Sequence, residues 1–250
     1  MTISPQPHSK WAGCPICTTP CTVPECSHNP YHLPDFYNLR CDQRVVLLFE
    51  SPNAPPKNSA RFSLPGNGNH ITTEYVETCR ADWAKWAERD PAWDALENAL
   101  SAHKCIPPRP ASPSGSLPGR LLESCYVTDV VKCSGLRRQT HKPTSHLDRT
   151  YAFLSQELAL LEHMRLLVCF GLTSWDAIRA ICQVSSLGCA RVYAGMTAVH
   201  GYPFAARLKS TGRQFHVIPL AFILGQNQFL RNSYFDYLEE GLEVLAKRAS

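Results

Sequence analysis

The chain has 250 residues, of which 44% are hydrophobic and 18% are charged, and its formal net charge is +4. These values are typical of a globular protein with a sizeable core, and the mild positive charge permits an anionic partner without requiring one. No apolar run approaches the roughly 18 residues of a membrane span, so no membrane association is expected. The first residues lack the apolar core of a secretory signal, and 12 cysteines in such a chain predict a cytoplasmic location.

Residues 1–42 are predicted to form a Cys-rich metal-binding segment, followed by an α/β domain over residues 43–250. In the segment, a Cys-x2-Cys pair is followed by Cys-x4-Cys-x-His, which supplies ligands for a tetrahedral metal site. The five candidate ligands are Cys14, Cys17, Cys21, Cys26 and His28. The spacing favours a structural zinc ion, while simple free thiols are the alternative interpretation.

The α/β domain begins with a short, continuous apolar run at 44–50, which is typical of a buried strand. A long loop rich in Pro, Gly and Asn follows, and a second loop rich in Pro, Ser and Gly covers 104–120. Helices are predicted at 73–89, 91–103, 147–162, 173–184 and 233–248, and the remaining strands at 124–131, 165–171 and 214–222.

Strands that alternate with helices predict a three-layer αβα sandwich around a central, mostly parallel, four-stranded sheet. In such sheets the ligand binds beyond the carboxyl ends of the strands. The predicted strand ends carry Glu50 and Asp129, so both acids are expected at the functional edge of the sheet.

Asp129 is unusual because it interrupts an otherwise apolar strand and precedes a strongly basic loop. A buried acid is costly unless it is paired or protonated. One explanation is a salt bridge to Lys132 or to an arginine of the following loop. The other is that Asp129 faces a pocket and binds a hydrogen-bond donor of a ligand.

The order of motifs after residue 44 resembles the uracil-DNA glycosylase superfamily, and most nearly its bacterial branch with cysteine-ligated iron–sulfur clusters. A strand ending in FESPN at 49–53 matches the Gly-Glu-x-Pro-Gly motif of that branch, and Phe62 matches the Phe that stacks on the flipped base. VTDVVKC at 127–133 matches a strand that reads Ile-Thr-Asn-Val-Val-Lys-Cys. The resemblance continues through LLVCFGLTSWDAI at 166–178 to IPLAFILGQNQFLRNS at 218–233, where the family has a His-Pro-Ser motif and a Leu-Arg-Asn-type segment.

Three positions depart from the family pattern. Asp129 stands where the family has an Asn that binds uracil, Phe222 where it has the motif histidine, and Ser51 where some branches have Asp. A carboxylate only accepts hydrogen bonds, so Asp129 disfavours uracil O4 and favours a base with an exocyclic amine, as in cytosine or adenine. We therefore expect a cytosine-type substrate, such as a modified base of phage DNA, and a role in antiviral defence.

The resemblance also suggests roles for other residues. Glu50 is the first candidate for activating the water and His141 is the second, because the RRQTHKP segment is similar to the loop of a branch that captures uracil-DNA covalently through a histidine. The predicted base pocket comprises Ser51, Pro52, Asn53, Phe62 and Phe222. The predicted DNA-backbone contacts are Lys132, Arg137, Arg138, Lys142, Asn227 and Arg231.

Two alternatives stay open at this point. By the resemblance, Cys14, Cys17 and Cys133 match three ligands of a [4Fe–4S] cluster, whose fourth ligand would fall near Thr150.

The expected activity is that of a DNA glycosylase acting on duplex or single-stranded DNA as a monomer. A conventional uracil-DNA glycosylase, or an inactive relative that only binds DNA, is the other functional prediction.

Overall fold

A computed structural model describes residues 42–50, 92–108, 121, 123–130, 144–188, 192, 195–221 and 234–249. The predicted metal-binding segment, apart from Asp42, and the predicted helix at 73–89 lie outside the described residues. The described elements, in chain order, are β1 (Val45–Phe49), α2 (Ala92–Ala102), β2 (Cys125–Asp129), α4 (Thr144–Leu160), β3 (Leu166–Phe170), α5 (Leu172–Ile181), β4 (Cys182–Ser186), α6 (Met196–Val199), β5 (Phe204–Leu208), β6 (Gln214–Leu220) and α7 (Tyr234–Ala249).

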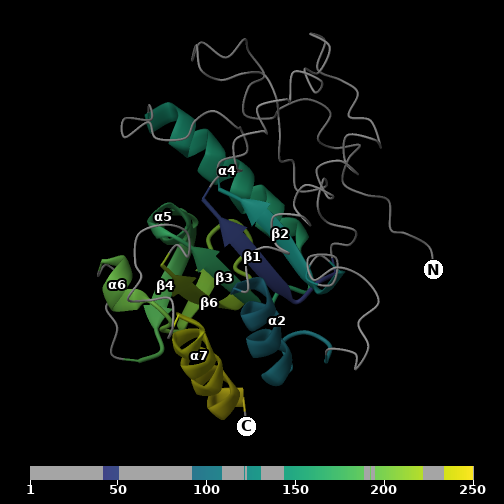
Figure 1. Cartoon of the computed structure of the whole chain (residues 1–250). Helices are drawn as coiled ribbons and strands as arrows, with labels where there is room; N and C mark the ends of the chain where they lie inside the picture. Colours follow the sequence, from purple (N-terminus) through teal and green to yellow (C-terminus); the bar gives the residue numbers. More distant parts are fainter. Residues whose placement is uncertain are drawn as a thin grey trace, which may run out of the picture.

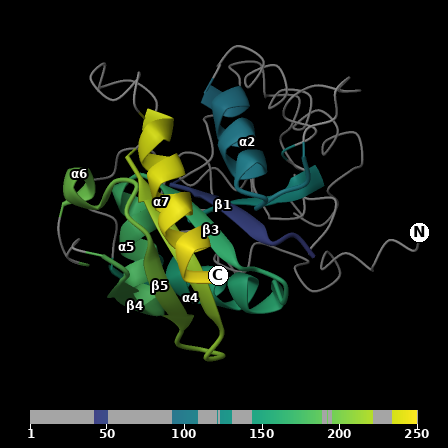
Figure 2. The same ribbon diagram turned by 90° about the horizontal axis from the view of Figure 1, so that it is seen from below.

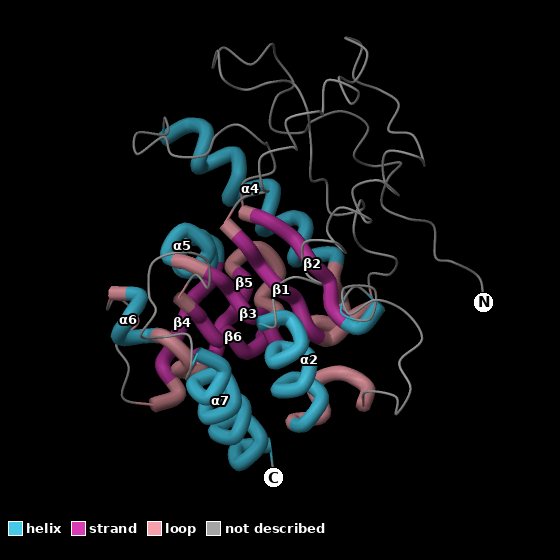
Figure 3. Tube along the Cα trace, in the orientation of Figure 1, coloured by secondary structure: helices cyan, strands magenta, loops and turns pink. Residues whose placement is uncertain are grey.

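The strands form one six-stranded sheet in the order β2-β1-β3-β6-β5-β4 (Figures 1 and 3). The neighbours β2, β1, β3 and β6 are parallel, and β5 is antiparallel to both β6 and β4. The predicted α/β class and its four parallel strands are confirmed. The prediction of a four-stranded sheet is wrong, because an antiparallel extension of two strands widens the sheet beyond β6.

The missed strand β4 explains the error in the helix predicted at 173–184. Helix α5 ends at Ile181, and the chain continues directly into an extended conformation at Cys182. No Gly or Pro separates the two elements, so the sequence gives no local sign of the change. The side chains of β4 alternate between buried and more exposed positions, as expected for a strand with one solvated face.

Two hydrophobic clusters cover the two faces of the sheet, which confirms the three-layer architecture. On one face, α2 and α7 contribute Leu96, Leu100, Leu238 and Leu242. On the other, α4 and α5 contribute side chains that include Trp175, which is fully buried. Figure 2 shows α2 and α7 together on one side of the sheet. Because both faces are covered, β1 and β3 consist almost entirely of apolar residues.

Helix α7 approaches the sheet closely at a pair of glycines. A Cβ atom on Gly241 would lie 2.3 Å from the carbonyl oxygen of Gly201, and one on Gly201 would lie 2.5 Å from Cβ of Tyr237. Gly201 also has a positive φ of 78°, a conformation that favours glycine. These contacts fix α7 against the turn that precedes β5. None of the helices in the described ranges is long and apolar enough to cross a membrane.

Candidate functional site

The carboxyl ends of the four parallel strands form the edge at which the sequence predicts a ligand site. The register pairs Phe49 with Asp129 and Phe170 with Leu220. Residues paired in this way project from the same face of the sheet, which here is the face covered by α2 and α7. Asp129, Phe49, Phe170 and Leu220 therefore form the last row of side chains across β2, β1, β3 and β6. We call these four residues the end row.

Asp129 is the polar member of the end row and is only 8% exposed. Every residue of β2 is buried. Alternation along the strand directs Cys125 and Val127 into the cluster beneath α2, so Asp129 projects on that same face. The predicted strand is confirmed and buried, but it ends at Asp129, so the acid is the last residue of β2 and does not interrupt the strand.

Two phenylalanines of the end row stack on each other beside Asp129, and Phe170 is only 1% exposed. The rings of Phe49 and Phe170 are stacked, with centroids 4.6 Å apart and planes 5° apart. Trp93, from the first turn of α2, packs against Phe49 with a centroid distance of 5.7 Å. The ring next to Asp129 is therefore held from two sides, which limits its motion.

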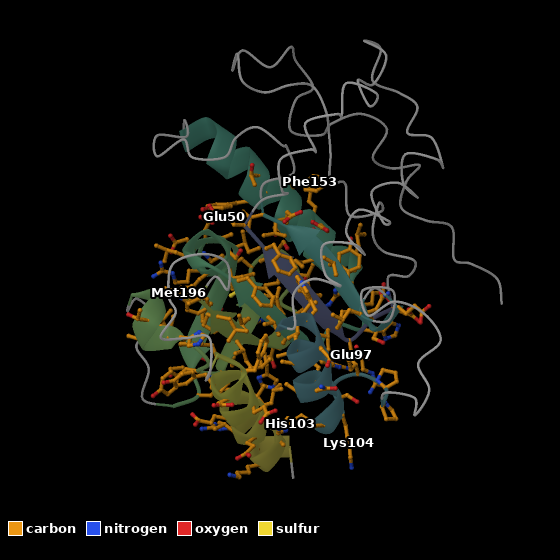
Figure 4. All side chains as sticks on the ribbon, viewed as in Figure 1. Glu50, Glu97, His103, Lys104, Phe153 and Met196 are labelled. Atoms are coloured by element: carbon orange, nitrogen blue, oxygen red, sulfur yellow. The ribbon has the colours of Figure 1, made fainter. Side chains whose placement is uncertain are left out.

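Glu50 follows β1 directly, and its side chain is partly buried. The backbone N–H of Val130 donates a hydrogen bond of 2.8 Å to the carbonyl oxygen of Phe49 and ties the two strand ends together. Glu50 and Asp129 thus lie next to this bond, one on each strand. In Figure 4, Glu50 lies at the end of β1 farthest from His103 and Lys104, which follow α2. Two acids predicted to be functional are therefore brought to adjacent strand ends.

A buried polar network, which the sequence analysis missed, lies on the opposite face of β2. Glu157 of α4 is 2% exposed. Its Oε1 accepts hydrogen bonds from the Tyr126 hydroxyl at 3.0 Å and from the Thr128 hydroxyl at 2.7 Å. The sequence did carry a signal, because Glu157 occupies a position in the apolar stripe of α4 between Leu154 and Leu158.

His200 is a second residue that the sequence analysis did not select. Its ring is 4% exposed, and Nδ1 accepts a hydrogen bond of 2.9 Å from the backbone N–H of Ala221, the residue after β6. Tyr237 of α7 packs beside it, with ring centroids 5.0 Å apart. Burial lowers the pKa of His200 to about 4, so the ring is neutral at pH 7. Since Nδ1 is an acceptor, Nε2 carries the proton.

This position of His200 matters because the chain leaves the sheet at Ala221 and continues to Phe222. By the resemblance, Phe222 stands where the family has its motif histidine. A neutral histidine from a distant part of the chain lies at the same strand end. No local motif could have revealed it, since its neighbour Ala221 is 21 residues away.

Apart from Glu50 and Asp129, the predicted site residues lie outside the described residues. They are His141, Ser51, Pro52, Asn53, Phe62 and Phe222, the predicted DNA contacts Lys132, Arg137, Arg138, Lys142, Asn227 and Arg231, and the predicted metal ligands Cys14, Cys17, Cys21, Cys26, His28 and Cys133. Thr150, near which a fourth cluster ligand was expected, is fully buried in α4.

Of the cysteines in the described ranges, Cys125, Cys169 and Cys182 are buried in the core and Cys105 packs against it. Cys105, Cys125, Cys169 and Cys182 are free thiols, and burial raises the pKa of each of them. A buried, protonated thiol is a poor nucleophile and a poor metal ligand. Within this part of the chain, no group of three or more His, Cys, Asp or Glu residues is arranged to hold a metal ion.

Comparison with known proteins adds no assignment to this geometry. No protein-family model matches the chain, and no curated protein matches its sequence. The strongest evidence for a site is therefore local: an end row that combines a buried acid with stacked aromatic rings, Glu50 on the adjacent strand, and a neutral histidine at the end of β6.

Proposed function

We propose that this chain is a DNA glycosylase that flips a cytosine-type base out of DNA and hydrolyses its N-glycosidic bond. The observation that carries the proposal is the buried carboxylate of Asp129, at the carboxyl end of a parallel strand beside Glu50. The motif order that resembles the uracil-DNA glycosylase superfamily supplies the reaction class. The substrate class follows from the carboxylate at the position of the family's Asn.

Asp129 would select the base by accepting a hydrogen bond from its exocyclic amine. Hydrogen bonds to charged groups contribute about 1.5–3 kcal/mol. Uracil presents a carbonyl oxygen at the same position, which would face the carboxylate without a proton between them. The hydrogen bond to an exocyclic amine and the repulsion between the carboxylate and the uracil oxygen both favour a cytosine-type base, so the pocket would reject uracil.

Glu50 would act on the sugar side of the bond. As the bond between C1′ and the base nitrogen breaks, its electron pair passes to the base and positive charge develops on the sugar. A carboxylate nearby stabilises this charge and accepts a proton from the water that attacks C1′, and the released base anion takes up a proton to complete the hydrolysis. The packed rings of Phe49, Phe170 and Trp93 would hold the strand ends that carry the two acids in place.

A base-release assay tests this proposal. Oligonucleotides carrying cytosine, 5-hydroxymethylcytosine, glucosylated hydroxymethylcytosine, uracil or hypoxanthine would be incubated with the full chain, and abasic sites would be detected as strand breaks after alkali. We expect breaks at a cytosine-type base, and a Glu50→Gln variant that binds the same DNA but cleaves at least about 100-fold more slowly.

The Asp129→Asn variant separates base selection from catalysis. An amide both donates and accepts, so the ratio of cytosine-type to uracil cleavage should fall about 100-fold. Glu162→Gln is the matched control, because this exposed acid lies before β3, at the opposite end of the sheet. Cleavage at uracil alone by the unaltered chain would refute the cytosine assignment. Binding without cleavage of any substrate would instead favour an inactive DNA-binding relative, which is the alternative that Phe222 supports.

A further inference from the structure

The amino end of the sheet carries a cavity of about 570 Å³ that the proposed function does not use. Its polar lining residues are Arg165, Gln183, Ser185, Arg207, Gln214 and His216. The cavity lies over β4, β5 and the start of β6, at the opposite end of β6 from Ala221 and the end row. Its volume lies within the range of about 300–1,000 Å³ that is common for sites of small ligands.

Strand register explains why these side chains face the same space. Arg207 of β5 pairs with Gln183 of β4 and with Gln214 of β6, and Ala205 pairs with His216 in the next row. Paired residues share a face of the sheet, and here all five project on the side of α7. Four of the five side chains are exposed, whereas the same face of β1 and β3 is buried beneath α2 and α7.

The cavity is positively charged. Arg165 and Arg207 line it, and no acidic residue is among its lining residues in the described part of the chain. Arg248, in the last turn of α7, donates a hydrogen bond of 2.6 Å to the carbonyl oxygen of Leu187, just after β4. Burial lowers the pKa of His216, and the positive charge of Arg248 lowers it further.

The guanidinium group of Arg207 lies against the turn of the β5–β6 hairpin. A Cβ atom on Gly212 would lie 3.3 Å from its Nη2 and 3.5 Å from its Nε, so the guanidinium group packs against the backbone of the turn. Gly212 has a φ of 74°, and this conformation keeps the turn free of a side chain at that point. A guanidinium restrained in this way loses less freedom when it binds an anion.

We propose that this cavity binds a small phosphate ester that carries hydroxyl groups, such as a sugar phosphate. Arginine side chains bind phosphate through two parallel N–H donors. Gln183, Gln214 and Ser185 supply the donors and acceptors that sugar hydroxyls require. Of the two aromatic residues that line the cavity, Phe215 is 4% exposed, whereas His216 is exposed and can donate or accept a hydrogen bond.

This binding site is separate from the proposed DNA site. Strand β6 has seven residues and spans roughly 20 Å between the cavity and the edge that carries Ala221. DNA held at the end row would contact the opposite end of the sheet. The inference therefore does not rest on the proposed glycosylase activity. The outcome of the base-release assay does not determine whether the cavity binds a phosphate ester, and the reverse is also true.

Nuclear magnetic resonance titration of the full chain tests the proposal, with ribose 5-phosphate as the probe and with ribose and inorganic phosphate as separate arms. We expect ribose 5-phosphate to bind with a Kd of about 1 mM or tighter, and to shift the amide signals of Gln183, Arg207, Gln214 and His216. Ribose and inorganic phosphate should each bind at least about tenfold more weakly, since each supplies half of the contacts.

Substitutions test whether the cavity is the site of binding. Arg207→Gln and Arg165→Gln should each weaken binding about tenfold or more. Lys104→Gln is the control, because it removes the same charge from an exposed position that does not line the cavity. Unchanged affinity in both arginine variants, shifts confined to other residues, or no binding up to about 10 mM would overturn the proposal. Displacement of ribose 5-phosphate by a single-stranded oligonucleotide at lower concentration would make a polynucleotide the occupant and overturn the small-molecule assignment.

Discussion

Acid is expected to destabilise this protein through His200, whose ring is 4% exposed and whose pKa is lowered by burial to about 4. The unfolded chain protonates the same ring near pH 6.5. Because the pKa is lower in the folded state, the stabilising contribution is fully present above about pH 6.5 and is lost as the pH falls toward 4. The shift from 6.5 to about 4 corresponds to at most about 3 kcal/mol of unfolding free energy.

The structure also gives the reason for this loss. The Nδ1 atom of neutral His200 accepts the hydrogen bond from the N–H of Ala221, and a protonated ring has no acceptor to offer. The charged ring would also be desolvated between Tyr237 and the end of β6. Protonation therefore removes the bond that fixes the chain where it leaves the sheet.

Urea unfolding followed by circular dichroism, at several pH values between about 7 and about 4, measures this contribution. In the His200→Asn variant, the amide oxygen can still accept the Ala221 hydrogen bond but does not titrate. The variant should be less stable at pH 7, because it loses ring packing. Its deficit relative to the unaltered chain should shrink by about 3 kcal/mol as the pH falls to about 4. A deficit that stays constant within about 0.5 kcal/mol would refute the buried, neutral state of His200.

Two further predictions concern packing around the site. Thr128→Val should lower the unfolding free energy by about 1–2 kcal/mol, because it removes one hydrogen-bond donor to the buried carboxylate of Glu157. A double-mutant cycle that combines it with Glu157→Gln should give a coupling energy of at least about 0.5 kcal/mol in urea unfolding. A coupling near zero would contradict the hydrogen bond. Gly241→Ala should destabilise the fold by about 1–3 kcal/mol in the same assay, because its Cβ would lie 2.3 Å from a carbonyl oxygen of Gly201. Gly188→Ala, with no atom within 4 Å of the added Cβ, is the control, and equal effects of the two changes would contradict the close approach.

The parallel part of the sheet was predictable because burial on both faces leaves a continuous apolar run in the sequence. β1 and β3 are such runs, and helices α2, α4, α5 and α7 follow their predicted ranges within three residues at each end. β4 and β5 were not predicted, since one of their faces is solvated and their composition is mixed. Cys182–Ser186 also follows α5 without a turn residue, so a helical pattern passes unbroken into a strand.

Of the candidate site residues, only those at the ends of predicted strands could be found from the sequence. Glu50 and Asp129 each stand at the carboxyl end of an apolar run, and parallel strands bring such ends to one edge. His200 and Glu157 were not predictable in the same way. His200 reaches the end of β6 through a tertiary hydrogen bond, and the role of Glu157 depends on two hydroxyl groups of a strand about 30 residues earlier.

Strand β2 brings two buried acids close together on opposite faces of the sheet, and their surroundings suggest different roles. Glu157 lies in the interior beneath α4, where two protein hydroxyls stabilise its carboxylate. Such an acid fixes the strand to the helix, and a ligand could reach it only by separating the two. Asp129 is the residue after Thr128 and the last residue of β2, and it pairs with Phe49, the residue before Glu50. Burial alone does not distinguish a structural acid from a functional one, and our proposal of a functional Asp129 is based on its position at the carboxyl edge. The hydrogen-bonded anchor at Thr128 would hold the Asp129 carboxylate in a fixed place, as selection of one exocyclic amine requires.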